Sequence, residues 1–427
     1  MELNELSAVE ASRLIAKGEI TSEALVEACL GRIAEREDTV KAWEYLDSER
    51  ALEQARALDR APRRGPLHGI PVGVKDIMDT ADMPTAYGSR IYHDHQPVWD
   101  ASCVALIRAA GGIVLGKTVT TEFAVFSPGK TTNPHNPAHT PGGSSSGSAA
   151  AVADLMVPLA LGTQTGGSTI RPAAFCGIVG YKPTFGWISR AGVKPCAESL
   201  DTIGVFGRNV EDAAFLASVL TGRPSLALNE NPRVPPHVGL CHTYEWPHAA
   251  SETVKAFEDA REQLSRLSVT AREVDLPESF SRLAEAQATI MNFEMAQSFA
   301  YEYSNHRDKL STRLQELIAT GQKCSPQTYD KAAALATECR GLLQCIFSDL
   351  DVLVAPSAVG EAPEGLASTG DPIFNTIWTL LHVPCVNIPF SKGPKGLPVG
   401  LQIVGRIGDD AHVPSASDWI FKNLSRL

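Results

Sequence analysis

The sequence predicts an α/β fold, in which a large and mostly buried sheet packs against helices. Short runs of β-branched and aliphatic residues alternate along the chain with stretches whose apolar residues recur at helical spacing. Hydrophobic residues make up 44% of the 427 residues and charged residues only 20%, so the chain can bury a large core without disulfides. This alternation indicates a mixed sheet sandwiched between layers of helices.

The elements are expected in a regular order. The first helix has an N-cap candidate at Thr21 or Ser22, followed by apolar residues through Ile33, and the second runs from Ser48 to Leu58. The Gly65-Pro66 pair ends this helical section. We then expect a strand at 70–77, a helix at 105–110, strands at 112–116, 157–161 and 238–241, helices at 254–267, 283–303 and 329–347, and strands at 352–355, 386–389 and 399–404.

The chain is predicted to form a single domain over residues 1–427. It contains neither an internal repeat at a spacing of 20–50 residues nor a low-complexity segment. The best linker candidate, residues 229–236, is interpreted as a surface loop within that domain.

Charge and cysteine usage exclude several classes of protein. The net charge is −11, and the longest basic run is the pair at 63–64, so nucleic acid and anionic membranes are not expected as partners. Nine cysteines without a Cys-x-x-Cys pair indicate reduced thiols in a cytoplasmic protein. Residues 1–18 lack the apolar core of a signal peptide, and the longest apolar stretch, 149–161, is too short to span a membrane.

Two glycine-bounded turns crowd hydroxyl groups into residues 131–171. The first turn reads Gly-Gly-Ser-Ser-Ser-Gly-Ser from Gly142, and the second reads Gly-Thr-Gln-Thr-Gly-Gly-Ser and ends at Ser168. Glycines allow sharp turns that bring backbone N–H groups close to a ligand. A serine after a Gly-Gly pair is well placed to be a nucleophile beside an oxyanion hole.

Other interpretations of this segment fit less well. A flexible linker would not lead directly into the Ala-rich helix former at 149–152. Residues 143–147 match the Gly-x-Ser-x-Gly elbow of α/β-hydrolases, but that elbow needs a preceding strand, and the prolines at 137 and 141 exclude a central strand. The segment also lacks the Gly-Lys-Ser/Thr ending of a phosphate loop.

Four motifs in order resemble those of the amidase signature family. They are Gly-Ile-Pro-Val-Gly-Val-Lys-Asp at 69–76, the serine-rich turn from 142, the second turn at 162–168, and Cys-Gly-Ile-Val-Gly-Tyr-Lys-Pro-Thr at 176–184. They cover a signature core at about residues 65–210. The resemblance implies one α/β domain and hydrolysis of a carbon–nitrogen bond through an acyl-enzyme.

The resemblance also implies a Ser–cis-Ser–Lys triad. Ser168 would be the nucleophile, Ser144 the bridging serine after a cis peptide bond, and Lys75 the base. A lysine can accept a proton only when it is neutral, and burial among apolar neighbours lowers its pKa. The apolar residues around Lys75 in the 69–77 segment are consistent with this role.

The backbone N–H groups of Thr165, Gly166, Gly167 and Ser168 are expected to form the oxyanion hole. Ser145 is a candidate substrate-binding residue, although a hydroxyl in a turn can equally satisfy local backbone groups.

Arg171 is the second substrate-binding candidate. It follows the nucleophile by three residues and, together with the triple serine, makes the chain resemble the malonamidase-like branch of the family. The resemblance implies that this guanidinium grips a substrate carboxylate. The alternative is a structural arginine paired with Asp201 or Glu198.

We therefore expect an amidase acting on a small linear amide, possessing no cofactor and no metal, and working as a homodimer. His93 and His95 lack further ligands for a metal site, and Cys176 is interpreted as a buried thiol. A urea- or carbamate-type substrate stays open, and so does the amidotransferase subunit of a tRNA-dependent complex. A non-catalytic binding module is disfavoured because Lys75, Ser144 and Ser168 are all present.

Overall fold

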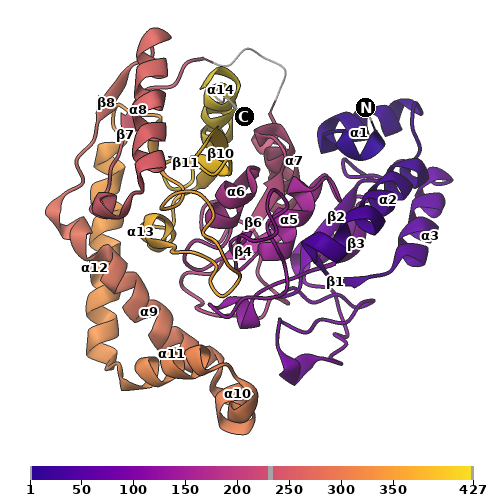
Figure 1. The fold of residues 1–427 in the computed structure, drawn as a ribbon, viewed down its shortest axis with the longest axis horizontal. Coiled ribbons are helices and arrows are strands. Elements are labelled where there is room, and N and C mark those ends of the chain that lie inside the picture. The colour runs from indigo at the N-terminus through magenta and orange to yellow at the C-terminus, as the bar shows by residue number, and fades with distance from the viewer. Residues whose placement is uncertain (1, 229–233, 425–427) are drawn as a thin grey trace.

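All strands of the described chain join one mixed sheet. The computed structural model describes residues 2–228 and 234–424, so part of the loop expected at 229–236 lies outside the described residues. The strand order is β1-β3-β2-β4-β6-β5-β10-β11-β9-β7-β8 (Figure 1). The strands are β1 (Trp43–Leu46), β2 (Pro71–Lys75), β3 (Ile113–Thr118), β4 (Leu159–Gln164), β5 (Val179–Lys182), β6 (Thr202–Gly207), β7 (Val238–Leu240), β8 (Ala271–Glu273), β9 (Val352–Pro356), β10 (Cys385–Lys392) and β11 (Pro398–Val404).

Parallel and antiparallel pairs are both present in this sheet. β2 lies between β3 and β4 and is parallel to both, whereas the pairs from β4 through β6, β5, β10 and β11 to β9 are antiparallel. Because the carboxyl ends of parallel strands meet at one edge, the ends of β2 and β4 lie side by side.

The helices carry local signals at their ends. Thr21 accepts a hydrogen bond from the Ala24 amide and Asp47 one from Arg50, as N-cap residues do. The helices are α1 (Ala8–Lys17), α2 (Ser22–Val40), α3 (Ser48–Asp59), α4 (Ser102–Ala109), α5 (Ser146–Ala153), α6 (Ile170–Cys176), α7 (Val210–Thr221), α8 (Ser251–Arg266), α9 (Leu283–Ser298), α10 (Ala300–Asn305), α11 (Thr312–Lys323), α12 (Pro326–Ile346), α13 (Ile373–Leu380) and α14 (His412–Leu424).

Helices cover both faces of the sheet. A side chain added at Gly204 of β6 would meet Thr169 at the start of α6, and one added at Gly207 would meet Asp212 in α7. Residues three apart in a strand point to opposite faces, so α6 and α7 lie on opposite faces of the sheet. Helix α5 packs beside α6, and α14 packs beside α7.

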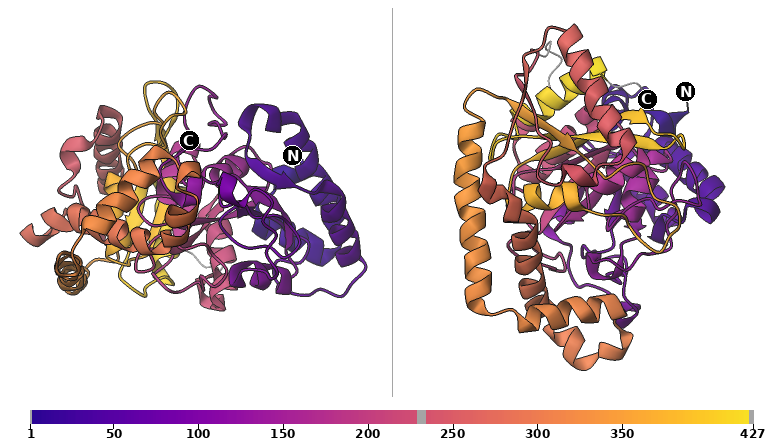
Figure 2. Two further views of the ribbon diagram at one scale, coloured as in Figure 1. Left: turned by 90° about the horizontal axis from the view of Figure 1, so that it is seen from below. Right: turned by 60° about the vertical axis from the view of Figure 1, so that its left-hand side comes forward.

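The second half of the chain adds an arm of helices next to the sheet. Helix α9 packs against α11, α12 and α13, and the views of Figures 1 and 2 show this arm extending from the sheet. The helix predicted at 283–303 divides into α9 and α10 around Phe299.

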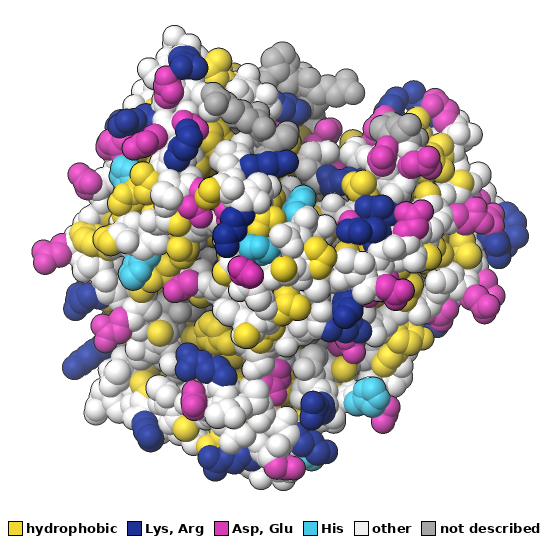
Figure 3. All heavy atoms as spheres, viewed as in Figure 1, with side chains coloured by type: hydrophobic (Ala, Val, Ile, Leu, Met, Phe, Trp, Pro, Cys, Tyr) yellow, Lys and Arg dark blue, Asp and Glu magenta, His cyan; other side chains and the backbone are white. Residues whose placement is uncertain are grey.

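The predicted fold class, a single α/β domain with a mixed central sheet between helices, is confirmed. On the face drawn in Figure 3, acidic and basic side chains are interspersed rather than gathered by sign. Within the part of the chain that the structure describes, no helix has the length and apolar character needed to cross a membrane.

Candidate functional site

Lys75 ends β2, which lies between β3 and β4 in the sheet, and is completely buried. Its Nζ donates hydrogen bonds of 2.7 Å to Ser144 Oγ and of 2.7 Å to Thr163 Oγ1, a residue of the neighbouring strand β4. Burial lowers the pKa of Lys75 to about 7, against an opposing effect of the negative charge on Asp201. Near neutral pH a substantial fraction of this amine is therefore uncharged and able to accept a proton.

Ser144 stands directly before α5, in a turn that the glycines make. The Gly143–Ser144 peptide bond is cis, as the resemblance implies. The Ser144 side chain reaches Lys75 on one side and lines a small cavity on the other.

Ser168 and the turn before it line the same cavity, which has a volume of about 50 Å³. The turn connects β4 to α6, and Ser168 is half-buried in it. The backbone N–H groups of Gly166, Gly167 and Ser168 donate to no acceptor in the described chain. Unpartnered amides next to a hydroxyl can stabilise the negative charge that develops on the oxygen of a carbonyl group when that hydroxyl attacks it.

The other walls of this cavity come from distant parts of the chain. They are Val125 and Phe126, Gln287, Met291 and Met295 of α9, and Thr369, Pro372 and Thr376 at α13. From their places in the predicted helices and loops, Phe293, Met295, Trp378 and Thr379 are candidates for the walls of the site, and of these four Met295 lines the cavity. The other three wall candidates lie elsewhere: Phe293 stacks on Tyr329, Trp378 is fully buried in the core, and Thr379 lies behind the Gly166 carbonyl.

Arg171 lines the cavity and is buried, with an exposed fraction of 3%. Its Nε donates to Thr369 O at 2.8 Å, and its Nη2 donates to Gly143 O at 2.8 Å. Its Nη1 has no hydrogen-bond partner among residues 2–228 and 234–424, and burial lowers the pKa of the guanidinium to about 10. Among the described residues it forms no ion pair with Asp201 or Glu198, so the alternative pairings named above are absent.

Asp201 instead holds the strand that leads to Ser168. One carboxylate oxygen accepts from Thr165 Oγ1, and the other accepts from the amides of Cys196 and Ala197. Burial raises the pKa of this carboxyl, and these hydrogen bonds offset part of that rise.

Ser145 also contacts the backbone, because its Oγ lies 3.2 Å from both the N and the O of Thr163. Substrate binding by Ser145 stays a prediction.

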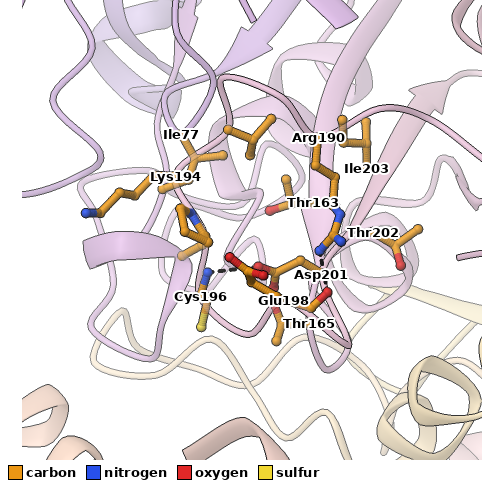
Figure 4. A pocket seen from close by; sticks show the side chains of 13 residues that line it. Ile77, Thr163, Thr165, Arg190, Lys194, Cys196, Glu198, Asp201, Thr202 and Ile203 are labelled. Carbon is orange, nitrogen blue, oxygen red and sulfur yellow. Dashed lines mark hydrogen bonds between the residues drawn. The ribbon is translucent and has the colours of Figure 1, made fainter. Parts of the chain in front are cut away.

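A second cavity, of about 220 Å³, adjoins the first and shares Ala124, Thr165 and Cys196 with it. Figure 4 shows the Asp201 carboxylate in its wall, pointing toward Thr165 and the Cys196 amide. Neither Ser144 nor Ser168 lines this larger space, whereas both line the smaller cavity.

His135 and His139, in the loop before Ser144, and the Cys176 thiol all have structural partners. His135 contacts Cys176 O at 2.9 Å, and His139 contacts Ala362 O at 2.7 Å. The Cys176 thiol donates to Pro141 O, and burial raises its pKa, which makes it a poor nucleophile. The described residues contain no cluster of three metal-ligating side chains.

Sequence reasoning missed two residues that contact this site, Thr163 and Gln287, and it offered Thr379 only as a wall position. Thr163 lies inside the second motif, where its hydroxyl next to a strand end is the available signal. Gln287 and Thr379 donate to the backbone of the turn from α9 and α13, and neither stands in a recognisable motif.

The chain is similar over nearly its whole length to known amidases and amidotransferase subunits. A family model described as Amidase matches residues 24–413. A glutamyl-tRNA(Gln) amidotransferase subunit of Natranaerobius thermophilus is 34% identical, over 97% of this chain and 94% of that protein. A crystal structure of an amidase superimposes with a TM-score of 0.90 at 32% identity, covering 98% of this chain and 100% of that one. Native peptide amidase from Stenotrophomonas maltophilia has a TM-score of 0.81 at 29% identity, covering 99% and 98%.

The matched family model spans more than nine-tenths of the sequence, and all four motifs, from 69–76 to 176–184, fall inside it. The chain therefore belongs to the amidase signature family.

Proposed function

We propose that this chain hydrolyses the carbon–nitrogen bond of a small linear amide through an acyl-enzyme at Ser168. One observation carries the proposal: a buried lysine with a lowered pKa contacts Ser144, which lines one small cavity with Ser168 and the free amides of the turn. That arrangement supplies a base, a proton relay, a nucleophile and an oxyanion hole.

In the proposed reaction, neutral Lys75 takes the hydroxyl proton of Ser144 while Ser144 takes that of Ser168. Ser168 Oγ attacks the amide carbon, and the negative charge that develops on the carbonyl oxygen is bound by the turn amides. The proton returns through Ser144 to the leaving nitrogen, the carbon–nitrogen bond breaks, and an amine or ammonia departs. Water then attacks the ester by the same relay, which releases the carboxylic acid and restores Ser168.

We further propose that the amide carries a carboxylate, as the malonamidase-like resemblance implies. Arg171 is buried, has one guanidinium nitrogen without a partner, and lines the cavity. A carboxylate is the group that this nitrogen would bind most strongly.

We also propose that the chain acts in the cytoplasm as a homodimer, without nucleic acid or membrane as a partner. Light scattering of the pure protein tests whether it is a dimer.

The experiment is ammonia release from pairs of amides that differ only by a carboxylate, with glutamine, biuret and a carbamate added. We expect Ser168→Ala and Lys75→Ala to lose turnover and Ser265→Ala, in an exposed part of α8, to keep it. Undiminished turnover in Ser168→Ala contradicts the acyl-enzyme. Arg171→Met should lose the preference for the carboxylated member of each pair; an unchanged preference contradicts carboxylate binding by Arg171.

A second function is favoured by the relatives named as subunits of glutamyl-tRNA(Gln) amidotransferase, which align over nearly the whole chain. In this alternative the chain releases ammonia for use by partner subunits. Stable copurification with such subunits, and turnover only in their presence, favour it. Turnover by the pure chain alone favours the self-sufficient amidase.

A further inference from the structure

The carbonyl groups of the turn at residues 165–168 accept hydrogen bonds that hold the turn in place. Thr165 O accepts from Gln287 Nε2 at 3.0 Å, and Gly166 O accepts from Thr379 Oγ1 at 2.6 Å. Gly167 O accepts from the Arg171 amide at 2.9 Å, within the first turn of α6. Each of the three carbonyls therefore has a donor, whereas the amides of the same three peptide units have no acceptor in the part of the chain that the structure describes.

These hydrogen bonds determine where the free amides point. In a planar trans peptide the C=O and N–H bonds point in opposite directions. A donor fixed on the carbonyl of Thr165 consequently directs the amide of Gly166 to the other side, and a donor on Gly166 O directs that of Gly167. A carbonyl that accepts a hydrogen bond also polarises its peptide unit, which makes the N–H a stronger donor.

Steric packing does not fix the first of these peptides. A Cβ added at Gly166 would meet its nearest neighbour, Thr376, at 3.7 Å, an ordinary van der Waals contact, so no tight contact constrains this residue. Glycine also has the greatest freedom to change its backbone angles. The orientation of this backbone therefore depends on the hydrogen bonds to its carbonyls.

The donor at Thr379 is itself oriented by Gln164. Gln164 Oε1 accepts from the amides of Thr169 and Ile170, so its Nε2 is the end that faces Thr379 and donates to its Oγ1 at 2.9 Å. The Thr379 hydroxyl has two acceptors, and its bond to Gly166 O, at 2.6 Å, is much shorter than that to Asn375 O, at 3.3 Å. Gln164, Gln287 and Thr379 are all buried, which protects these bonds from competition with water.

We infer that Gln287 and Thr379 are positioning residues of the oxyanion hole. Their hydrogen bonds to the carbonyls of Thr165 and Gly166 aim the amides of Gly166 and Gly167 at the substrate's carbonyl oxygen. The inference rests on the proposed amide hydrolysis at Ser168. It gives the second half of the chain, through α9 and α13, a part in stabilising the transition state.

Isosteric variants separate this role from simple packing. Thr379→Val removes the hydroxyl at constant shape, Thr379→Ser keeps it, and Gln287→Met removes the donor at similar volume. We expect Thr379→Val and Gln287→Met to lower kcat by about tenfold to a hundredfold with KM changed much less, since oxyanion contacts strengthen in the transition state. Thr379→Ser should regain most of the lost kcat. Thr221→Val is the matched control, because that threonine donates to a carbonyl one turn back in α7, away from both cavities.

A second readout does not depend on turnover. A trifluoromethyl ketone analogue of the best substrate forms a tetrahedral adduct with an active-site serine, and its affinity should fall in parallel with kcat/KM in the two variants. Substrate affinity, measured on the inactive Ser168→Ala background, should stay unchanged. Circular dichroism confirms that each variant is folded.

The outcomes separate the inference from the function on which it rests. Wild-type kcat in both Thr379→Val and Gln287→Met overturns the inference, and so does a loss that Thr379→Ser fails to restore. Activity that survives in Ser168→Ala overturns the proposed function instead.

Discussion

Lys75 is the residue whose burial and contacts matter most for the proposed chemistry. An amine enclosed by protein, with two hydroxyls at 2.7 Å and no carboxylate in direct contact, is destabilised in its charged form. The lowered pKa is therefore a consequence of where β2 ends, and it leads to two predictions.

The first prediction concerns the pH dependence of activity. Because Lys75 must be neutral to act as a base and its pKa is about 7, kcat/KM should rise by about tenfold between pH 6 and pH 8 and then level off. Asp201→Asn removes the negative charge that opposes the effect of burial, so its profile should move to lower pH. A flat wild-type profile over this range would contradict Lys75 as the base.

The second prediction concerns stability. Below pH 7 the folded and unfolded chains both carry the Lys75 proton, and the folded state bears the whole penalty of burying a charge. Between about pH 7 and the ordinary value of 10.5, the unfolded chain binds more protons than the folded chain, so wild-type stability rises with pH. Denaturant unfolding of Lys75→Met should therefore show its greatest advantage over wild type below pH 7. That advantage should shrink toward pH 10, and a constant difference would contradict the lowered pKa.

At the scale of elements, α6 is held against β6 by a contact that only glycine permits. A Cβ added at Gly204 would lie 2.3 Å from Thr169 Oγ1, at the N-terminus of the helix that follows Ser168. The absence of a side chain thus lets the turn that carries Ser168 approach the sheet closely.

The third prediction tests this approach. Gly204→Ala should displace the start of α6, lowering the free energy of unfolding by about 1–3 kcal/mol and reducing kcat at the same time. Gly31→Ala in the exposed part of α2 is the control: nothing lies within 4 Å of its added Cβ, so it should stabilise the protein by about 0.5–1 kcal/mol. Chemical denaturation and steady-state kinetics of both variants provide the measurement. Unchanged stability in Gly204→Ala would refute the close contact.

Several elements were predicted closely, and others were not. The helix at 48–58 and the strands at 352–355 and 399–404 agree with α3, β9 and β11, because each has a strong apolar period and clear ends. β6 was not predicted, since Gly204 and Gly207 are poor strand formers. Because these two glycines have no side chains, α6 and α7 can pack closely on opposite faces of the sheet.

At the scale of the whole molecule, the nine cysteines are free thiols spread through the fold. Seven are buried, Cys324 is half-buried and Cys345 is exposed. The structure thus depends on its large core and not on covalent cross-links, as the absence of Cys-x-x-Cys pairs indicates.

The fourth prediction follows from this distribution. An aromatic disulfide reagent should modify Cys345 rapidly in the native protein and Cys324 more slowly, and all nine thiols only after unfolding in guanidinium. Reducing agent should leave Tm unchanged. Rapid native modification of five or more thiols, or a Tm that falls on reduction, would be incompatible with the structure.

The sequence by itself determined the fold class, the family motifs and the candidate residues for the proposed reaction. Lys75, Ser144 and Ser168 each stand in a short motif of glycines and hydroxyl residues, whose local conformational demands leave a readable pattern. Only the tertiary structure decided how these groups are surrounded. Gln287 and Thr379 reach the turn from 122 and 213 positions away, and the unpartnered nitrogen of Arg171 depends on what packs around it. Contacts between such distant residues are created by packing, and therefore leave no local periodicity or motif in the chain.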